Sequence, residues 1–112
     1  MTNSSSTSFI VACKKEVNKE YVMKVLKDEV ERMVKDEHFD YCYDFDKEKS
    51  LAEKTHHICD LVSNYIVVGS DMELGDWNLK GGEISSECCD VIDAFLYFGN
   101  IDDEKIKLTC CH

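Results

Sequence analysis

The feature that most restricts the fold is a run of apolar residues at helical spacing between Asn18 and His38. Asn18 belongs to the residue types that cap helix N-termini, and after it an apolar stripe is interleaved with charged residues. The stripe consists of Tyr21, Val22, Val25, Leu26, Val30, Met33 and Val34. We therefore expect a long amphipathic helix that ends near His38 and that needs a second layer to cover its apolar side.

Two further segments have the same periodicity. One begins after a cap at Asp46 or Ser50, and its stripe consists of Leu51, Thr55, Ile58, Val62 and Tyr65. The other follows the Gly81-Gly82 pair, and its stripe consists of Ile84, Cys88, Val91, Phe95 and Phe98. Gly99 comes next, where a left-handed C-terminal cap is expected. The chain is thus predicted to have three helices.

Short apolar runs between these helices predict strands. Residues 8–13 are apolar on both faces, which indicates a buried strand, and residues 66–69 indicate a second one. Residues 105–110 alternate strictly, which predicts a strand with one solvated face and two lysines at a sheet edge. Residues 39–46 fit either a short edge strand or an ordered loop, and residues 70–77 are expected to form an acidic loop.

These elements give the order β-α-α-β-α-β, with a small sheet covered by about three helices. This order predicts an α+β fold, or a small α/β fold. A length of 112 residues suits one domain, because two half-length domains would each bury too little surface. We expect that domain to cover residues 1–112, with residues 1–7 as a flexible or irregular Ser-rich start.

The chain is strongly acidic, and its charge is unevenly distributed along the sequence. The net charge is -10, and the part from Asp60 onward holds 11 acids but only 3 bases. Such a field disfavours direct contact with nucleic acid and with anionic lipid. The start at Met1 has neither a basic region nor a long apolar run, which predicts a cytoplasmic protein with reduced thiols.

Cysteine and histidine supply the alternative site, a zinc centre. Its ligands would come from His56, Cys59, Cys110, Cys111 and His112. His56 and Cys59 have the spacing to share a helix face, but the chain has no Cys-x-x-Cys pair. Ordinary packing of cysteine as a small apolar residue is the favoured interpretation, so we expect no cofactor. The acidic surroundings also oppose a reactive thiolate, and no catalytic residue is predicted.

Two acidic segments with aromatic residues predict a protein-binding surface. Between Asp36 and Asp46 lie five acids, four aromatic residues and no base. Carboxylates there would steer a basic partner while aromatic rings supply contact area, although the rings could instead cover the core. The predicted binding residues are Asp36, Glu37, Asp40, Tyr41, Tyr43 and Asp44 in this segment, and Asp71, Glu73, Asp76 and Trp77 in the second acidic loop.

The opening Asn3-Ser4-Ser5-Ser6-Thr7-Ser8-Phe9 resembles the start of uncharacterised small phage and bacterial proteins. In size and acidity the chain is similar to anti-CRISPR proteins and other phage inhibitors of host defence. This resemblance implies an inhibitor that blocks a basic, nucleic-acid-handling site on a host protein such as a CRISPR effector. The alternatives are a metal-binding or redox-responsive Cys/His domain, and a small structural or assembly subunit that forms a homo-oligomer.

Overall fold

The computed structural model describes residues 7–36, 49–67, 71–84, 91–101 and 103–111. Within them the order is β1 (Thr7–Lys14), α1 (Lys19–Val34), α3 (Leu51–Val67), β2 (Met72–Leu74), β3 (Trp77–Ile84), α4 (Val91–Phe98) and β4 (Ile106–Cys111). The four strands form one antiparallel sheet in the order β2-β3-β1-β4. The α+β class is confirmed, and the observed order is β-α-α-β-β-α-β.

The first two helices begin at side-chain caps. The Asn18 side chain accepts a hydrogen bond from the Tyr21 N–H at 2.9 Å, as predicted, and α1 ends at Val34 rather than near His38. In α3 the Glu53 N–H donates to the Ser50 hydroxyl at 3.2 Å, so that Ser50 acts as the cap. Asp46, the other predicted cap, lies outside the described residues.

Residues 66–69 were predicted to be a strand, and that prediction is wrong for the part that the structure describes. Ile66 and Val67 form the last turn of α3. Val62 and Ile66 are both buried and lie four residues apart, so the apolar stripe of the helix continues through this turn. Packing of that stripe against α1 overrides the β propensity of Ile66 and Val67.

The predicted acidic loop 70–77 is also wrong, because β2 and the start of β3 form a hairpin there. Gly75 and Asp76 are the two loop residues, and Gly75 has a φ of +60°. A glycine with positive φ at the first loop position suits the twist of a two-residue hairpin. The Gly81-Gly82 pair, expected to separate a loop from a helix, lies inside β3.

The third helix is shorter than predicted. Ile84 belongs to β3, residues 85–90 lie outside the described part, and α4 starts at Val91. Gly99 does not adopt the predicted left-handed conformation, since Gly75 is the one described glycine with positive φ. A Cβ at Gly99 would lie 2.6 Å from the Phe95 carbonyl oxygen, so close backbone approach explains this glycine.

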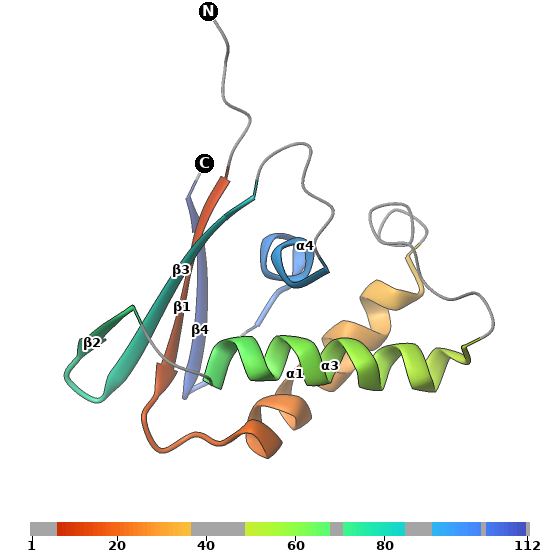
Figure 1. Cartoon of the computed structure of the whole chain (residues 1–112), viewed down its shortest axis with the longest axis horizontal. Helices are drawn as coiled ribbons and strands as arrows, with labels where there is room; N and C mark the ends of the chain where they lie inside the picture. The colour runs from red at the N-terminus through yellow and green to blue at the C-terminus, as the bar shows by residue number, and fades with distance from the viewer. Residues whose placement is uncertain (1–6, 37–48, 68–70, 85–90, 102, 112) are drawn as a thin grey trace, which may run out of the picture.

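The sheet is covered on one face. Figure 1 shows α1, α3 and α4 on the same side of the strands. On central strand β1, Phe9, Val11 and Cys13 face the helices and are buried, whereas Ile10 is 46% exposed. The prediction that this strand is buried on both faces is therefore wrong. The edge position and alternation predicted for residues 105–110 are confirmed in β4, where Ile106 is buried and Lys107 exposed.

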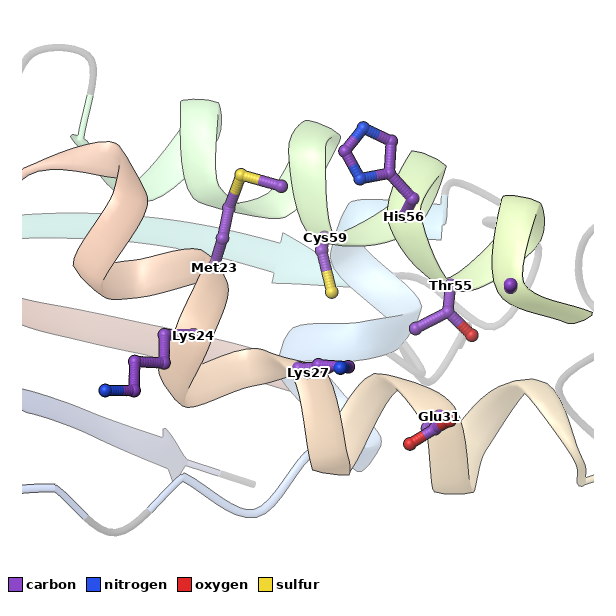
Figure 2. A pocket seen from close by; sticks show the side chains of 8 residues that line it. Met23, Lys24, Lys27, Glu31, Thr55, His56 and Cys59 are labelled. Carbon is purple, nitrogen blue, oxygen red and sulfur yellow. The ribbon is translucent and has the colours of Figure 1, made fainter.

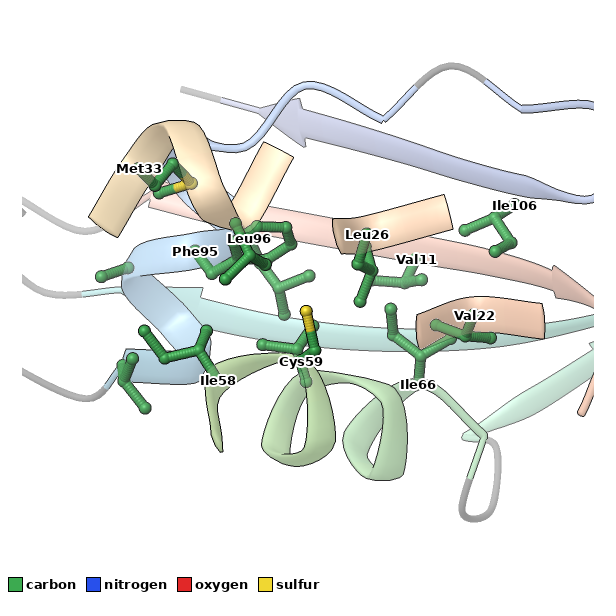
Figure 3. Close-up of a cluster of buried hydrophobic side chains, with 14 of the residues drawn as sticks. Val11, Val22, Leu26, Met33, Ile58, Cys59, Ile66, Phe95, Leu96 and Ile106 are labelled. Carbon is green, nitrogen blue, oxygen red and sulfur yellow. The ribbon is translucent and has the colours of Figure 1, made fainter. Parts of the chain in front are cut away.

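The core lies between the inner sheet face and the helices (Figure 3). Its largest fully buried side chains include Phe9, Leu26, Ile58, Phe95 and Ile106, one from each of the elements β1, α1, α3, α4 and β4. Every one of these elements contributes its apolar side to this single cluster. Of the four large apolar residues found exposed in the described ranges, Ile10, Met72 and Leu74 belong to the strands and Leu51 belongs to α3.

Candidate functional site

The candidate site is the outer sheet face, the side turned away from the helices. Strand alternation and the pairing register place every second residue of each strand on it. Its described members are Met72 and Leu74 of β2, Trp77, Leu79, Gly81 and Glu83 of β3, Ser8, Ile10, Ala12 and Lys14 of β1, and Lys107 and Thr109 of β4. No helix of the described ranges covers these residues (Figure 1).

Apolar side chains are concentrated on the β2-β3-β1 part of this face. Met72 is 58% exposed and Leu74 is 65% exposed, and the register places them beside Leu79 and Trp77. Ala12 pairs with Leu79 on the other side, so these side chains form one patch rather than scattered positions. Exposed apolar residues are ordinary when isolated, whereas contiguous exposed patches are typical of interaction surfaces.

Three predicted binding residues, Asp71, Glu73 and Asp76, lie along the hairpin that borders this patch. The Asp76 carboxylate lies 4.0 Å from the Lys14 ammonium, and the Glu73 carboxylate lies 3.5 Å from the Lys15 ammonium. Exposed ion pairs of this kind contribute only about 0–1 kcal/mol, so both carboxylates can exchange these lysines for a partner's cations. The structure thus places three carboxylates, predicted as part of a loop, on a hairpin whose outer face is apolar; strand alternation puts Asp71 and Glu73 on the side of β2 opposite Met72 and Leu74.

Asp71 and Trp77 have more specific roles. The Asp71 side chain accepts a hydrogen bond from the Gly81 N–H at 2.8 Å, which satisfies a donor of β3 just beyond the end of β2. The Lys14 ammonium lies 4.6 Å from the Trp77 ring centroid, within the range of a cation–π contact. Trp77 is therefore a half-buried member of the outer sheet face and not the exposed loop residue that we expected.

The other predicted binding segment is represented by Asp36 alone. Asp36 is exposed and follows α1, where its N–H donates to the Met33 carbonyl at 3.0 Å. Glu37, Asp40, Tyr41, Tyr43 and Asp44 lie outside the described residues. The candidate site therefore includes only the predicted binding residues of the β2-β3 hairpin. The prediction for residues 37–44 stays a prediction.

Apart from the outer sheet face, a hollow lies between α1 and α3 (Figure 2). It has a volume of about 530 Å³, and its lining includes Met23, Lys27, Glu31, His56 and Cys59. Burial raises the pKa of the Cys59 thiol to about 11, with a smaller opposing effect of the Lys27 charge. A thiol of that pKa is almost fully protonated at neutral pH and is a poor nucleophile.

The proposed zinc ligands are not brought together in the part of the chain with described positions. Figure 2 shows the His56 ring directed away from α1 and the Cys59 sulfur directed toward it. The Cys110 thiol instead donates to the Leu96 carbonyl at 3.5 Å, and the Cys111 side chain and His112 lie outside the described set. Among described residues no three His, Cys, Asp or Glu side chains form a group that could hold a metal.

The apolar members of the candidate site were missed at the level of sequence. Partner binding was not predicted for Met72, Leu74, Leu79 and Ile10, because residues 70–77 were expected to form a loop. The signal was present in Met72-x-Leu74-Gly75-Asp76-Trp77-x-Leu79, where alternating apolar residues flank a Gly-Asp pair. This is the pattern of a two-residue hairpin with one apolar face.

Comparisons with other proteins add no assignment. In the ranges with described positions, no helix is both long enough and apolar enough to span a bilayer. Neither a protein-family model, nor a curated protein, nor a solved structure matches the chain.

Proposed function

We propose that the chain is a non-enzymatic protein-binding module, and that it binds its partner with the outer sheet face. The observation that carries this proposal is the patch of Met72, Leu74, Trp77 and Leu79 on a sheet face that no described helix covers. At about 25 cal/mol for each Å² of apolar surface removed from water, covering such a patch is strongly favourable. Half-buried Trp77 in the patch is the residue type that most often dominates binding energy.

The hairpin carboxylates define the chemistry of the partner. Asp76 borders the patch and is exposed, so a bound partner would place a lysine or arginine side chain opposite it, whereas strand alternation directs Glu73 to the other side of β2. A basic, nucleic-acid-handling host protein, as expected for an anti-defence inhibitor, is one partner of this kind. The net charge of -10 would accelerate its encounter with such a surface at low salt.

The test compares two substitutions of exposed leucines. Leu74→Asp places a charge in the patch, whereas Leu51→Asp changes a leucine that is also exposed, at 41%, but belongs to α3 on the helical side. Immobilised wild-type protein should retain a partner from host extract in a salt-sensitive manner. Leu74→Asp should lose that partner and Leu51→Asp should keep it. Equal retention by both variants would remove the outer sheet face from consideration.

A further inference from the structure

The hollow between α1 and α3 is large enough to hold a small molecule. Its volume of about 530 Å³ lies within the roughly 300–1,000 Å³ that is usual for small-molecule sites. The residues that line it all belong to these two helices (Figure 2). A ligand in the hollow would therefore leave the outer sheet face uncovered.

The base of this hollow, formed by Met23, Thr55 and Cys59, is uncharged. Cys59 is buried, and burial raises the pKa of its thiol to about 11, so the thiol is neutral at pH 7. The Thr55 hydroxyl donates to the Leu51 carbonyl at 2.8 Å, so its hydrogen is already used within α3. Met23 adds a partly buried apolar side chain that packs against the core. The base therefore suits an apolar group better than a polar one.

The α1 side of the hollow is basic, in contrast to the chain as a whole. Lys24 and Lys27 line it and lie one turn apart on α1. Neither forms an ion pair with an acid of the described ranges, whereas Lys19 and Arg32 of the same helix do. Figure 2 shows Lys27 opposite Cys59, whose pKa the Lys27 charge lowers slightly against the effect of burial. Two ammonium groups beside an apolar base favour an anionic ligand.

We propose that the hollow binds a small organic anion with an apolar body, of the medium-chain carboxylate class. Its carboxylate accepts hydrogen bonds from the Lys24 and Lys27 ammonium groups, and its hydrocarbon chain lies over the uncharged base. Glu31 also lines the hollow, one turn beyond Lys27, and repels a second negative charge on the ligand. This site is separate from the outer sheet face, so the inference goes beyond the proposed function and does not depend on it.

The experiment is isothermal titration calorimetry of the full chain with sodium octanoate, below the concentration at which octanoate forms micelles. Two further probes separate charge from apolar contact: acetate has the charge without the hydrocarbon chain, and octylammonium has the chain with the opposite charge. Octanoate should bind in a single site and more tightly than either probe by about tenfold or more. Absence of octanoate binding, or equal affinity for octanoate and octylammonium, would overturn the inference.

Two substitutions that change the net charge equally test the position of the anion. Lys27→Glu should weaken octanoate binding by about tenfold or more, because an attractive contact becomes a repulsive one. Lys15→Glu is the matched control, since Lys15 lies in the turn after β1 and its ammonium faces Glu73. It should bind octanoate as the wild type does, and equal weakening in both variants would count against the hollow. Ala52→Leu should fill the hollow from an exposed position and abolish binding while its circular dichroism spectrum stays native.

The Leu74→Asp variant separates this inference from the proposed function. It should lose the protein partner and still bind octanoate as tightly as the wild type. Loss of octanoate binding in Leu74→Asp would place the ligand on the outer sheet face and overturn the inference. Octanoate binding by a chain that retains no protein would support the inference and reject the proposed function, and the reverse result would do the opposite.

Discussion

Neighbouring glycines of β3 should respond in opposite ways to the addition of one methyl group. Gly82 lies on the inner face beneath the Phe9 ring, and a Cβ there would lie 2.3 Å from Phe9 Cζ. An ordinary carbon–carbon contact is about 3.5–4.0 Å, and the ring is fully buried, so it must move by more than 1 Å into a filled core. Such overpacking costs about 1–3 kcal/mol.

Gly81→Ala is the matched control, because its methyl group points to the open face. Replacing glycine in a strand recovers about 0.5–1 kcal/mol of backbone entropy in both variants. The free energy of unfolding should therefore rise by about 0.5 kcal/mol in Gly81→Ala and fall by about 0.5–2.5 kcal/mol in Gly82→Ala. Urea denaturation, followed by circular dichroism, measures both values.

A second substitution shows whether the Phe9 ring is the cause. In Phe9→Leu the space above Gly82 is larger, so adding Gly82→Ala to that background should cost less than it does in the wild type. Equal unfolding free energies for Gly81→Ala and Gly82→Ala would refute the reasoning, because they would mean that the inner face tolerates the methyl group. The reasoning would also fail if the destabilisation caused by Gly82→Ala were the same in the Phe9→Leu background as in the wild type.

Three further predictions concern the helices and the titrating groups. Asn18→Ala should lower the free energy of unfolding by about 1 kcal/mol because α1 loses its side-chain cap, whereas Asn18→Asp should be nearly neutral in chemical denaturation. Cys59, whose pKa burial raises to about 11, should react slowly with iodoacetamide at neutral pH and rapidly in urea; fast labelling of the folded protein would contradict its burial. The pKa of Asp103 is lowered by hydrogen bonds from the Lys105 N–H and the Tyr21 hydroxyl, so its stabilising effect is present at neutral pH and is lost as pH falls below about 4. The melting temperature of Asp103→Asn should accordingly fall less steeply with acid than that of the wild type, and parallel curves would rule this out.

The helices could be predicted well because the signals that specify them, apolar periodicity and capping residues, lie within short segments of the sequence. Apolar residues three and four positions apart must share a helix face, and Asn18 and Ser50 have side chains that satisfy the first free N–H groups. The alternation in β4 has the same character, since Ile106 and Lys107 must point to opposite sides of any sheet. These elements depend on neighbours within one or two turns of the chain.

The candidate site could be predicted only in part. Asp71, Glu73, Asp76 and Trp77 were identified by composition, but composition does not say that they border an apolar sheet face. That relation depends on the hairpin at Gly75, which the Gly-Asp pattern could have indicated. The boundary at Ile66 depends on packing of α3 against α1, and no local pattern distinguishes a buried helix end from a short buried strand.

The sequence by itself determined an acidic α+β chain with capped amphipathic helices and an alternating edge strand, because charge, capping and periodicity are properties of short segments. Only the tertiary structure decided which sheet face is covered. Ile10 and Val11 are equally apolar, yet Val11 is buried and Ile10 is exposed, because the register of β1 against β3 and β4 turns one of them toward the helices. Strand pairing between distant segments sets that register, and with it the apolar surface that we propose binds a partner.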